Sequence, residues 1–100
     1  MNAPRNSSFD DYVVKGLTDP TEAAAYIEAA LELDDPAALL AALRQVAKVH
    51  GMAEVSRCAD LGEKTLFRAL SENGNPILST VQKVSHAVGL RLSMTAEPAQ

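Results

Sequence analysis

The chain has 100 residues and a net charge of −4, with 47% hydrophobic residues but only 4% aromatic ones. This length predicts one domain with a modest core that gains stability from a partner or from dimerisation. No apolar run reaches the roughly 18 residues that a membrane span needs. The start, MNAPRNSS, lacks the apolar stretch of a signal peptide, so we expect a cytoplasmic protein.

Charge is distributed unevenly along the chain. Residues 1–36 hold two basic and eight acidic residues, whereas residues 37–100 hold seven basic and five acidic ones. Such asymmetry indicates separate surfaces for separate partners. The alternative is that the acidic residues form an ordinary solvated helix face.

The first part of the chain divides into a tail and an acidic unit. Residues 1–8 are polar, which predicts a disordered tail. Residues 9–35 form the acidic unit, in which residues 9–17 predict an extended arm docked on the domain. A helix then begins at Pro20, with Asp19 as its cap and Glu22 completing a capping box, and ends near Leu33.

Residues 36–96 are expected to form a helix-turn-helix domain, followed by a tail at 97–100. Its first helix, residues 36–50, repeats the start signal in Asp34-Asp35-Pro36 and stops at Gly51. Alanine is abundant in the chain, which suits closely packed helices. The predicted fold class is therefore all-α.

Residues 55–70, VSRCADLGEKTLFRAL, are the most informative stretch. They indicate two short amphipathic helices, at about 52–59 and 63–71, joined by a tight turn. Cys58 is expected to face the core, and Asp60 tolerates the left-handed backbone that the turn needs. Gly62 can cap the second helix without a side-chain bond, which costs a few tenths of a kcal/mol. This pairing lets a small protein place a helix in the major groove of DNA.

The last elements are a helix and a strand. After the loop at residues 73–76, a helix begins at Ser79 or Thr80 and ends at Gly89. Apolar residues then alternate with polar ones at Leu90, Leu92 and Met94, which predicts a short β-strand. A lone strand needs a partner, and the same strand of a second copy would satisfy its backbone. The alternative is an extended tail packed on its own helices.

The chain resembles the antidote (antitoxin) proteins of bacterial addiction modules, within the lambda-repressor-like (Xre/Cro) helix-turn-helix superfamily. The resemblance covers about residues 9–94, and its most specific part is the order L-F-R-A-L-S-x-x-G-N-P-x-x-x-T-V-x-K-V-x-x-A-V-G-L from Leu66 to Leu90. The chain departs from the pattern at Asp60, where Gly is common, and at Gly62, where Ser or Thr is usual. The missing hydroxyl removes one expected phosphate contact.

This resemblance implies a fold of about five helices and a protein that neutralises a toxin encoded beside it and represses their shared operon. The toxins of this branch are small basic ribonucleases of the RelE/HigB type. The expected partners are therefore this toxin, operator DNA and a second copy of the chain.

Residues of the second helix of the pair are candidates for reading DNA bases. Lys64 can reach a base edge or a phosphate, with Thr65 at the edge of the same face. Arg68 can bind a guanine through two hydrogen bonds, worth roughly 1–3 kcal/mol of discrimination. Phe67 could touch a thymine methyl group, but packing against the loop at Pro76 is the favoured interpretation. A solubilising helix face is the alternative for these cations.

Further residues are candidates for phosphate contacts. Arg57 lies on the first helix of the pair, which is expected to cross the DNA backbone. Ser79 and Thr80 begin the next helix, where free backbone N–H groups and the helix dipole favour an anion, and Lys83 can add to them. With so few cations, we expect weak and salt-dependent binding to non-specific DNA.

The acidic unit is the candidate for the toxin contact. Apolar side chains surrounded by charge are typical of a protein interface, and acidic charge steers a basic partner to it. The candidate residues are Phe9, Asp10, Asp11, Tyr12, Glu22, Tyr26, Glu28 and Glu32. Asp34 and Asp35 extend the same acidic strip.

We expect neither catalysis nor a metal or other cofactor. The single cysteine excludes an internal disulfide and a multi-cysteine metal site, and His50 and His86 have no carboxylate at a spacing that makes a triad. The sequence therefore predicts an antitoxin and autorepressor that acts by binding. The alternatives are a stand-alone transcriptional regulator without a toxin and a protein-interaction adaptor.

Overall fold

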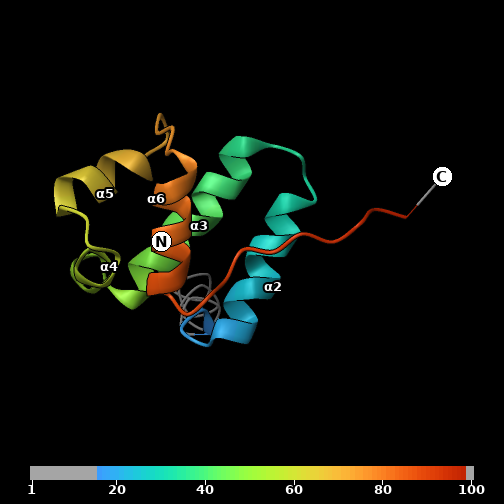
Figure 1. The fold of residues 1–100 in the computed structure, drawn as a ribbon, viewed down its shortest axis with the longest axis horizontal. Coiled ribbons are helices and arrows are strands. Elements are labelled where there is room, and N and C mark those ends of the chain that lie inside the picture. Colours follow the sequence, from blue (N-terminus) through green and yellow to red (C-terminus); the bar gives the residue numbers. More distant parts are fainter. Residues whose placement is uncertain (1–15, 99–100) are drawn as a thin grey trace, which may run out of the picture.

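The computed structural model describes residues 16–98. Within them the chain forms five α-helices and no β-strand (Figure 1): α2 (Pro20–Leu31), α3 (Pro36–His50), α4 (Met52–Ala59), α5 (Glu63–Ala69) and α6 (Leu78–Ala87). This confirms the all-α prediction. The tail at 1–8 and most of the predicted arm lie outside the described residues, but Leu17, the last residue of that arm, is buried in the core.

The two aspartates that precede helices behave differently. Asp35 caps α3, because its side chain accepts a hydrogen bond of 3.0 Å from the backbone N–H of Ala37. Asp19 occupies the same position before α2, but its side chain makes no capping bond. Its own backbone N–H donates to the carbonyl of Gly16 at 3.1 Å, so Glu22 has no free donor to accept. The predicted capping box is therefore wrong.

The core lies where α3 meets α2 and α4, with α6 packed on α4. Its members come from every described helix and from the segments that flank them: Leu17, Ala23, Leu40, Leu43, Val46, Ala47, Val55, Leu66, Leu70, Val84 and Val88. The α2 helix packs mainly on α3, and α4 packs on α3, α5 and α6. Small residues such as Ala23 and Ala47 are fully buried, which lets the helix axes approach closely.

The turn between α4 and α5 has the left-handed residue that the sequence predicts. Asp60 adopts φ 58° and ψ 47°. The backbone N–H of Leu61 donates to the carbonyl of Ser56 at 3.0 Å, and the Ser56 hydroxyl donates to the carbonyl of Leu61. Gly62 then begins α5 without a side-chain cap, as predicted.

Two further contacts hold α5 and the loop that follows it. The Arg44 Nη1 group of α3 donates a hydrogen bond of 2.6 Å to the carbonyl of Leu70, the residue that ends α5. Gly74 lies against the same helix end, since a Cβ there would come within 2.1 Å of the Ala69 carbonyl oxygen. Only glycine fits at that point of the loop.

The end of the chain differs from the prediction. Gly89, at φ 86°, closes α6, and the N–H of Leu90 returns to the Ser85 carbonyl at 2.8 Å. Residues 90–98 then run as an extended segment across α2 (Figure 1) and form no β-strand. The strand prediction is wrong for the single chain, because residues 91–98 find no backbone partner among the described residues.

Candidate DNA-binding and partner-binding surfaces

The exposed face of α5 carries the predicted base-reading residues. Lys64, Thr65 and Arg68 are exposed, whereas Leu66 between them is fully buried. Phe67 keeps 52% of its surface exposed, so the favoured packing against the loop covers at most half of its ring. The helix therefore presents two cations, a hydroxyl and part of an aromatic ring on one solvent-facing surface.

Arg57, the predicted phosphate contact of α4, is already paired. Its guanidinium forms a salt bridge with Glu54 one helical turn earlier, and both side chains are largely exposed. The hydrogen bond from Arg57 lowers the pKa of Glu54 below its ordinary value, so the carboxylate stays charged. A DNA phosphate at this position would have to compete with Glu54 for the guanidinium.

Cys58 lies beside this pair. The prediction that it faces the core is wrong. Its Sγ atom donates to Glu54 Oε2 at 3.3 Å, and the side chain is exposed. The buried positions of α4 are Val55, Ser56 and Ala59, so the buried face turns toward Ser56 and away from Cys58. The bond to Glu54 raises the pKa of the Cys58 thiol, with a smaller contribution from desolvation.

The beginning of α6 can offer backbone N–H groups to a phosphate. The helix starts at Leu78 behind Ile77, whose side chain makes no capping bond. Ser79 is exposed and Thr80 half-buried in the first turn, and Lys83 is exposed one turn after Ser79. These three side chains could join the N–H groups around one anion.

The structure describes half of the predicted toxin-binding residues, and these four do not lie on one flank of α2. Phe9, Asp10, Asp11 and Tyr12 lie outside the described residues. On α2, Glu28 follows Glu22 by six residues and Glu32 follows Tyr26 by six, and six residues turn a helix by about 120°. All four are exposed. Glu22 and Tyr26 therefore share one flank of α2, and Glu28 and Glu32 share another.

The predicted dimer residues lie on the extended C-terminal segment. Leu90 is half-buried, Leu92 is 45% exposed and Met94 is fully exposed. They do not form the predicted strand. Two of them nevertheless present apolar surface to solvent.

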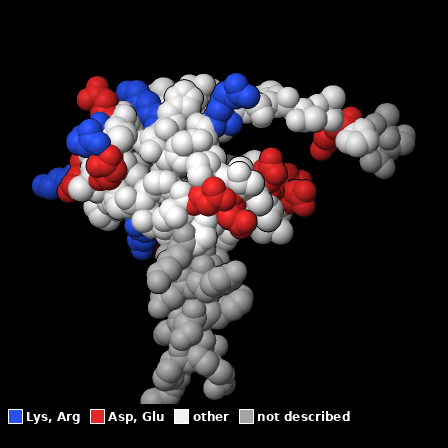
Figure 2. Space-filling model, turned by 90° about the horizontal axis from the view of Figure 1, so that it is seen from below, with Lys and Arg blue, Asp and Glu red and all other residues white. Residues whose placement is uncertain are grey.

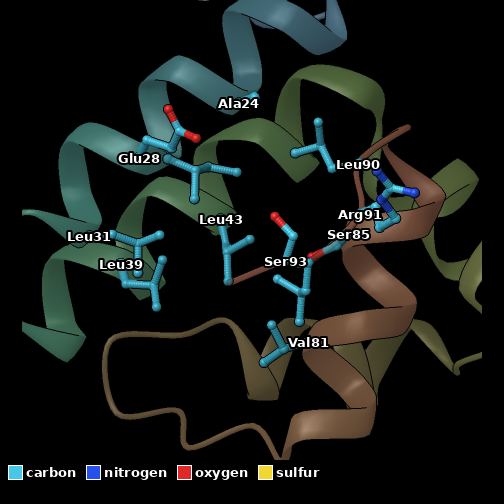
Figure 3. Close-up of a pocket in the computed structure, with 12 residues that line it drawn as sticks. Ala24, Glu28, Leu31, Leu39, Leu43, Val81, Ser85, Leu90, Arg91 and Ser93 are labelled. Carbon is cyan, nitrogen blue, oxygen red and sulfur yellow. The ribbon is translucent and has the colours of Figure 1, made fainter. Parts of the chain in front are cut away.

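Sequence reasoning missed an apolar groove on the α2 side of the molecule (Figure 3). It has a volume of about 160 Å³ and lies between α2, α3, α6 and residues 90–93. Its apolar lining includes Ala24, Ile27, Leu31, Leu39, Leu43 and Val81. Leu39 and Leu31 also line a neighbouring hollow with Asp34 and Asp35, so the groove continues toward the turn between α2 and α3. Helical periodicity shows that these side chains belong to apolar helix faces, but it cannot show that α2 and α3 leave a gap.

Acidic and basic side chains are distributed differently over the molecule. Acidic side chains gather on the side where α2 lies, whereas toward α4 and α5 the Lys and Arg side chains are interspersed with acidic ones (Figure 2). Among residues 16–98, Arg57 and Glu54 form the one salt bridge. The acidic side chains of α2 therefore have no basic partner in the described part of the chain.

Comparison with known proteins identifies the family. The family model described as "Probable addiction module antidote protein" matches residues 6–96. The chain belongs to this antidote family. It is also 33% identical over 82 residues to an uncharacterised protein of Haemophilus influenzae, a match that covers 82% of this chain and 84% of the relative. No solved structure matches significantly.

Membership of the antidote family implies a cognate toxin as partner. None of the helices described for this antidote combines the length and hydrophobicity of a membrane-spanning segment. The antidote thus offers two chemically different surfaces: the mixed, cation-bearing face of α4 and α5, and the acidic side around α2 with its apolar groove.

Proposed function

We propose that this antidote neutralises a RelE/HigB-like ribonuclease and represses its own operon through α4 and α5. Family membership supports the antidote role and favours it over a stand-alone regulator. The resemblance described above supports the toxin class. The protein acts by covering a toxin surface and by occupying DNA, without catalysis of its own.

The exposed face of α5 is the observation that carries the DNA-binding proposal. A left-handed turn at Asp60 joins α4 to α5, and α5 buries Leu66 while Lys64, Thr65 and Arg68 face solvent. In this proposal α5 enters the major groove, and the start of α6 binds a phosphate. Glu63 and the Glu54–Arg57 pair reduce the positive charge nearby, so base contacts must supply much of the affinity.

The protein is proposed to act as a homodimer, because two copies on one DNA site recover the affinity that so few cations cannot supply alone. Two copies could hold their α5 helices about 34 Å apart, one turn of DNA, on a palindromic site. Leu92 and Met94 are exposed apolar candidates for the contact. Light scattering at micromolar concentration tests this part of the proposal, since a strictly monomeric protein would contradict it.

A binding titration with the DNA upstream of the protein's own gene tests repression. Arg68→Ala should remove specific binding, because it deletes the proposed guanine contact. Lys83→Ala should weaken binding to specific and unrelated DNA alike and make the salt dependence shallower. Unchanged binding of the Arg68 variant would contradict the assigned readout, and wild-type protein that prefers no upstream sequence would contradict repression itself.

A further inference from the structure

We infer that the apolar groove between α2, α3, α6 and residues 90–93 is the toxin-binding site of this antidote. It takes one aromatic or branched apolar side chain of the toxin, and Lys or Arg side chains of the toxin flank that anchor and meet Glu28, Asp34 and Asp35. This inference rests on the proposed antidote function and assigns the surface that carries it.

The size of the groove favours a protein side chain over a small-molecule ligand. Its volume of about 160 Å³ is well below the roughly 300–1,000 Å³ of sites that hold drug-sized ligands. An apolar cavity of about 150 Å³ accommodates one benzene ring. A single Phe, Leu or Ile side chain of a partner therefore fills this space.

The apolar rim is already exposed in the free protein. Leu31, on the groove wall, is 50% exposed. Leu39 lines both the groove and the hollow next to it, so the apolar surface continues along α3. Covering such side chains removes apolar area from water, which favours association.

The charges around the groove select a basic partner. Glu28 borders the groove, and Asp34 and Asp35 border its continuation, whereas Arg91 is the one basic residue of this lining. Asp35 is held by its bond to Ala37, and Asp34 adopts a left-handed backbone at φ 53°. None of the three acids has a basic partner among the described residues. An acidic partner segment would meet repulsion, whereas Lys or Arg would meet three carboxylates that have no basic partner among the described residues.

The decisive experiment measures binding of the product of the neighbouring gene to purified antidote. Ala24 lines the groove, so Ala24→Leu should fill the space of the anchor from within and weaken binding more than about tenfold. Ala25 is the next residue of α2 and is exposed outside the groove, so Ala25→Leu is the matched control and should bind like wild type. Circular dichroism and thermal unfolding establish that both variants fold.

A second pair of variants tests the charges. Glu28→Gln combined with Asp34→Asn should weaken binding and reduce its dependence on salt, and Asn keeps the left-handed backbone accessible at position 34. Glu72→Gln, an exposed acid on the loop after α5, should change neither.

The outcomes separate this inference from the proposed function. If the folded Ala24→Leu variant binds the neighbouring gene's product as tightly as wild type does, the groove assignment is overturned and the antidote function stays intact. If wild-type antidote does not bind the neighbouring gene's product at all, the antidote function and the groove assignment both fail.

Discussion

Ser56 and Leu61 are joined by two hydrogen bonds that run in opposite directions across the turn between α4 and α5. The N–H of Leu61 donates to the Ser56 carbonyl at 3.0 Å, and the Ser56 hydroxyl donates to the Leu61 carbonyl. Ser56 is only 7% exposed, so water cannot easily replace its hydroxyl. This double link fixes the direction in which α5 leaves the turn.

Replacing Ser56 with Ala should lower the free energy of unfolding by about 1–2 kcal/mol, because the half-buried Leu61 carbonyl loses a donor. For a domain of this size, each kcal/mol corresponds to a Tm decrease of about 4–8 °C. Urea unfolding followed by circular dichroism measures the change. Ser93→Ala is the control, since Ser93 is exposed on the C-terminal segment, and equal stability of the two variants would contradict the structural role.

Gly74→Ala should be among the most destabilising single-methyl additions in the chain. A Cβ at this position would meet the carbonyl oxygen of Ala69 at 2.1 Å, and because that oxygen belongs to the backbone, the loop must move. We expect a loss of about 1–3 kcal/mol. Gly16→Ala is the matched control, because a Cβ there has nothing within 4 Å. Similar thermal unfolding of the two variants would show that the loop does not lie against α5 as described.

Arg44→Met should loosen the end of α5. The charged guanidinium donates to the Leu70 carbonyl at 2.6 Å, and a hydrogen bond to a charged group contributes about 1.5–3 kcal/mol. Lys48→Met on the exposed face of the same helix removes an equal charge without this bond. Hydrogen exchange should show faster exchange of α5 amides in the Arg44 variant only. Equal exchange in both variants would mean that Arg44 does not hold α5.

Cys58 should react slowly with iodoacetamide in the native protein, although it is exposed. Its raised pKa reduces the thiolate fraction at a given pH, and the thiolate is the nucleophile. Between pH 7 and 9, alkylation should therefore be slower than for the same cysteine in urea. Glu54→Gln removes the charged acceptor and should accelerate the native reaction. A native rate equal to the urea rate, unchanged by Glu54→Gln, would exclude the bond to Glu54.

Local chemical signals allowed much of the fold to be predicted. Asp60 has the left-handed conformation that its short polar side chain tolerates, and Asp35 forms the cap that its position before Pro36 indicates. The same signal failed at Asp19, because its backbone N–H bonds to the Gly16 carbonyl and its side chain forms no cap at the start of α2. Cys58 was misplaced because an eight-residue helix leaves the direction of its buried face to tertiary contacts, here those of Ser56.

Of the two candidate surfaces, the sequence predicts the exposed face of α5 but not the groove. The exposure of Lys64 and Arg68 follows from the spacing of Leu66 and Leu70 along α5. The groove could not be predicted, because it depends on how far α2 stands from α3 and on the path of residues 90–93. The bond from Arg44 to Leu70 likewise joins residues 26 positions apart, which no local pattern shows.

The packing of α2 has a consequence for how the molecule opens. This helix buries Ala23 and Ala30, packs Ile27 against the core and rests mainly on α3, whereas α4 contacts α3, α5 and α6. Free energies of local opening are lowest where few apolar contacts hold an element. The α2 helix can therefore detach in a transient partial unfolding while α4 stays packed on α3 and α6, and its amides should exchange before those of α4. Heating or mild denaturant would then release the acidic wall of the groove before α4 leaves the core.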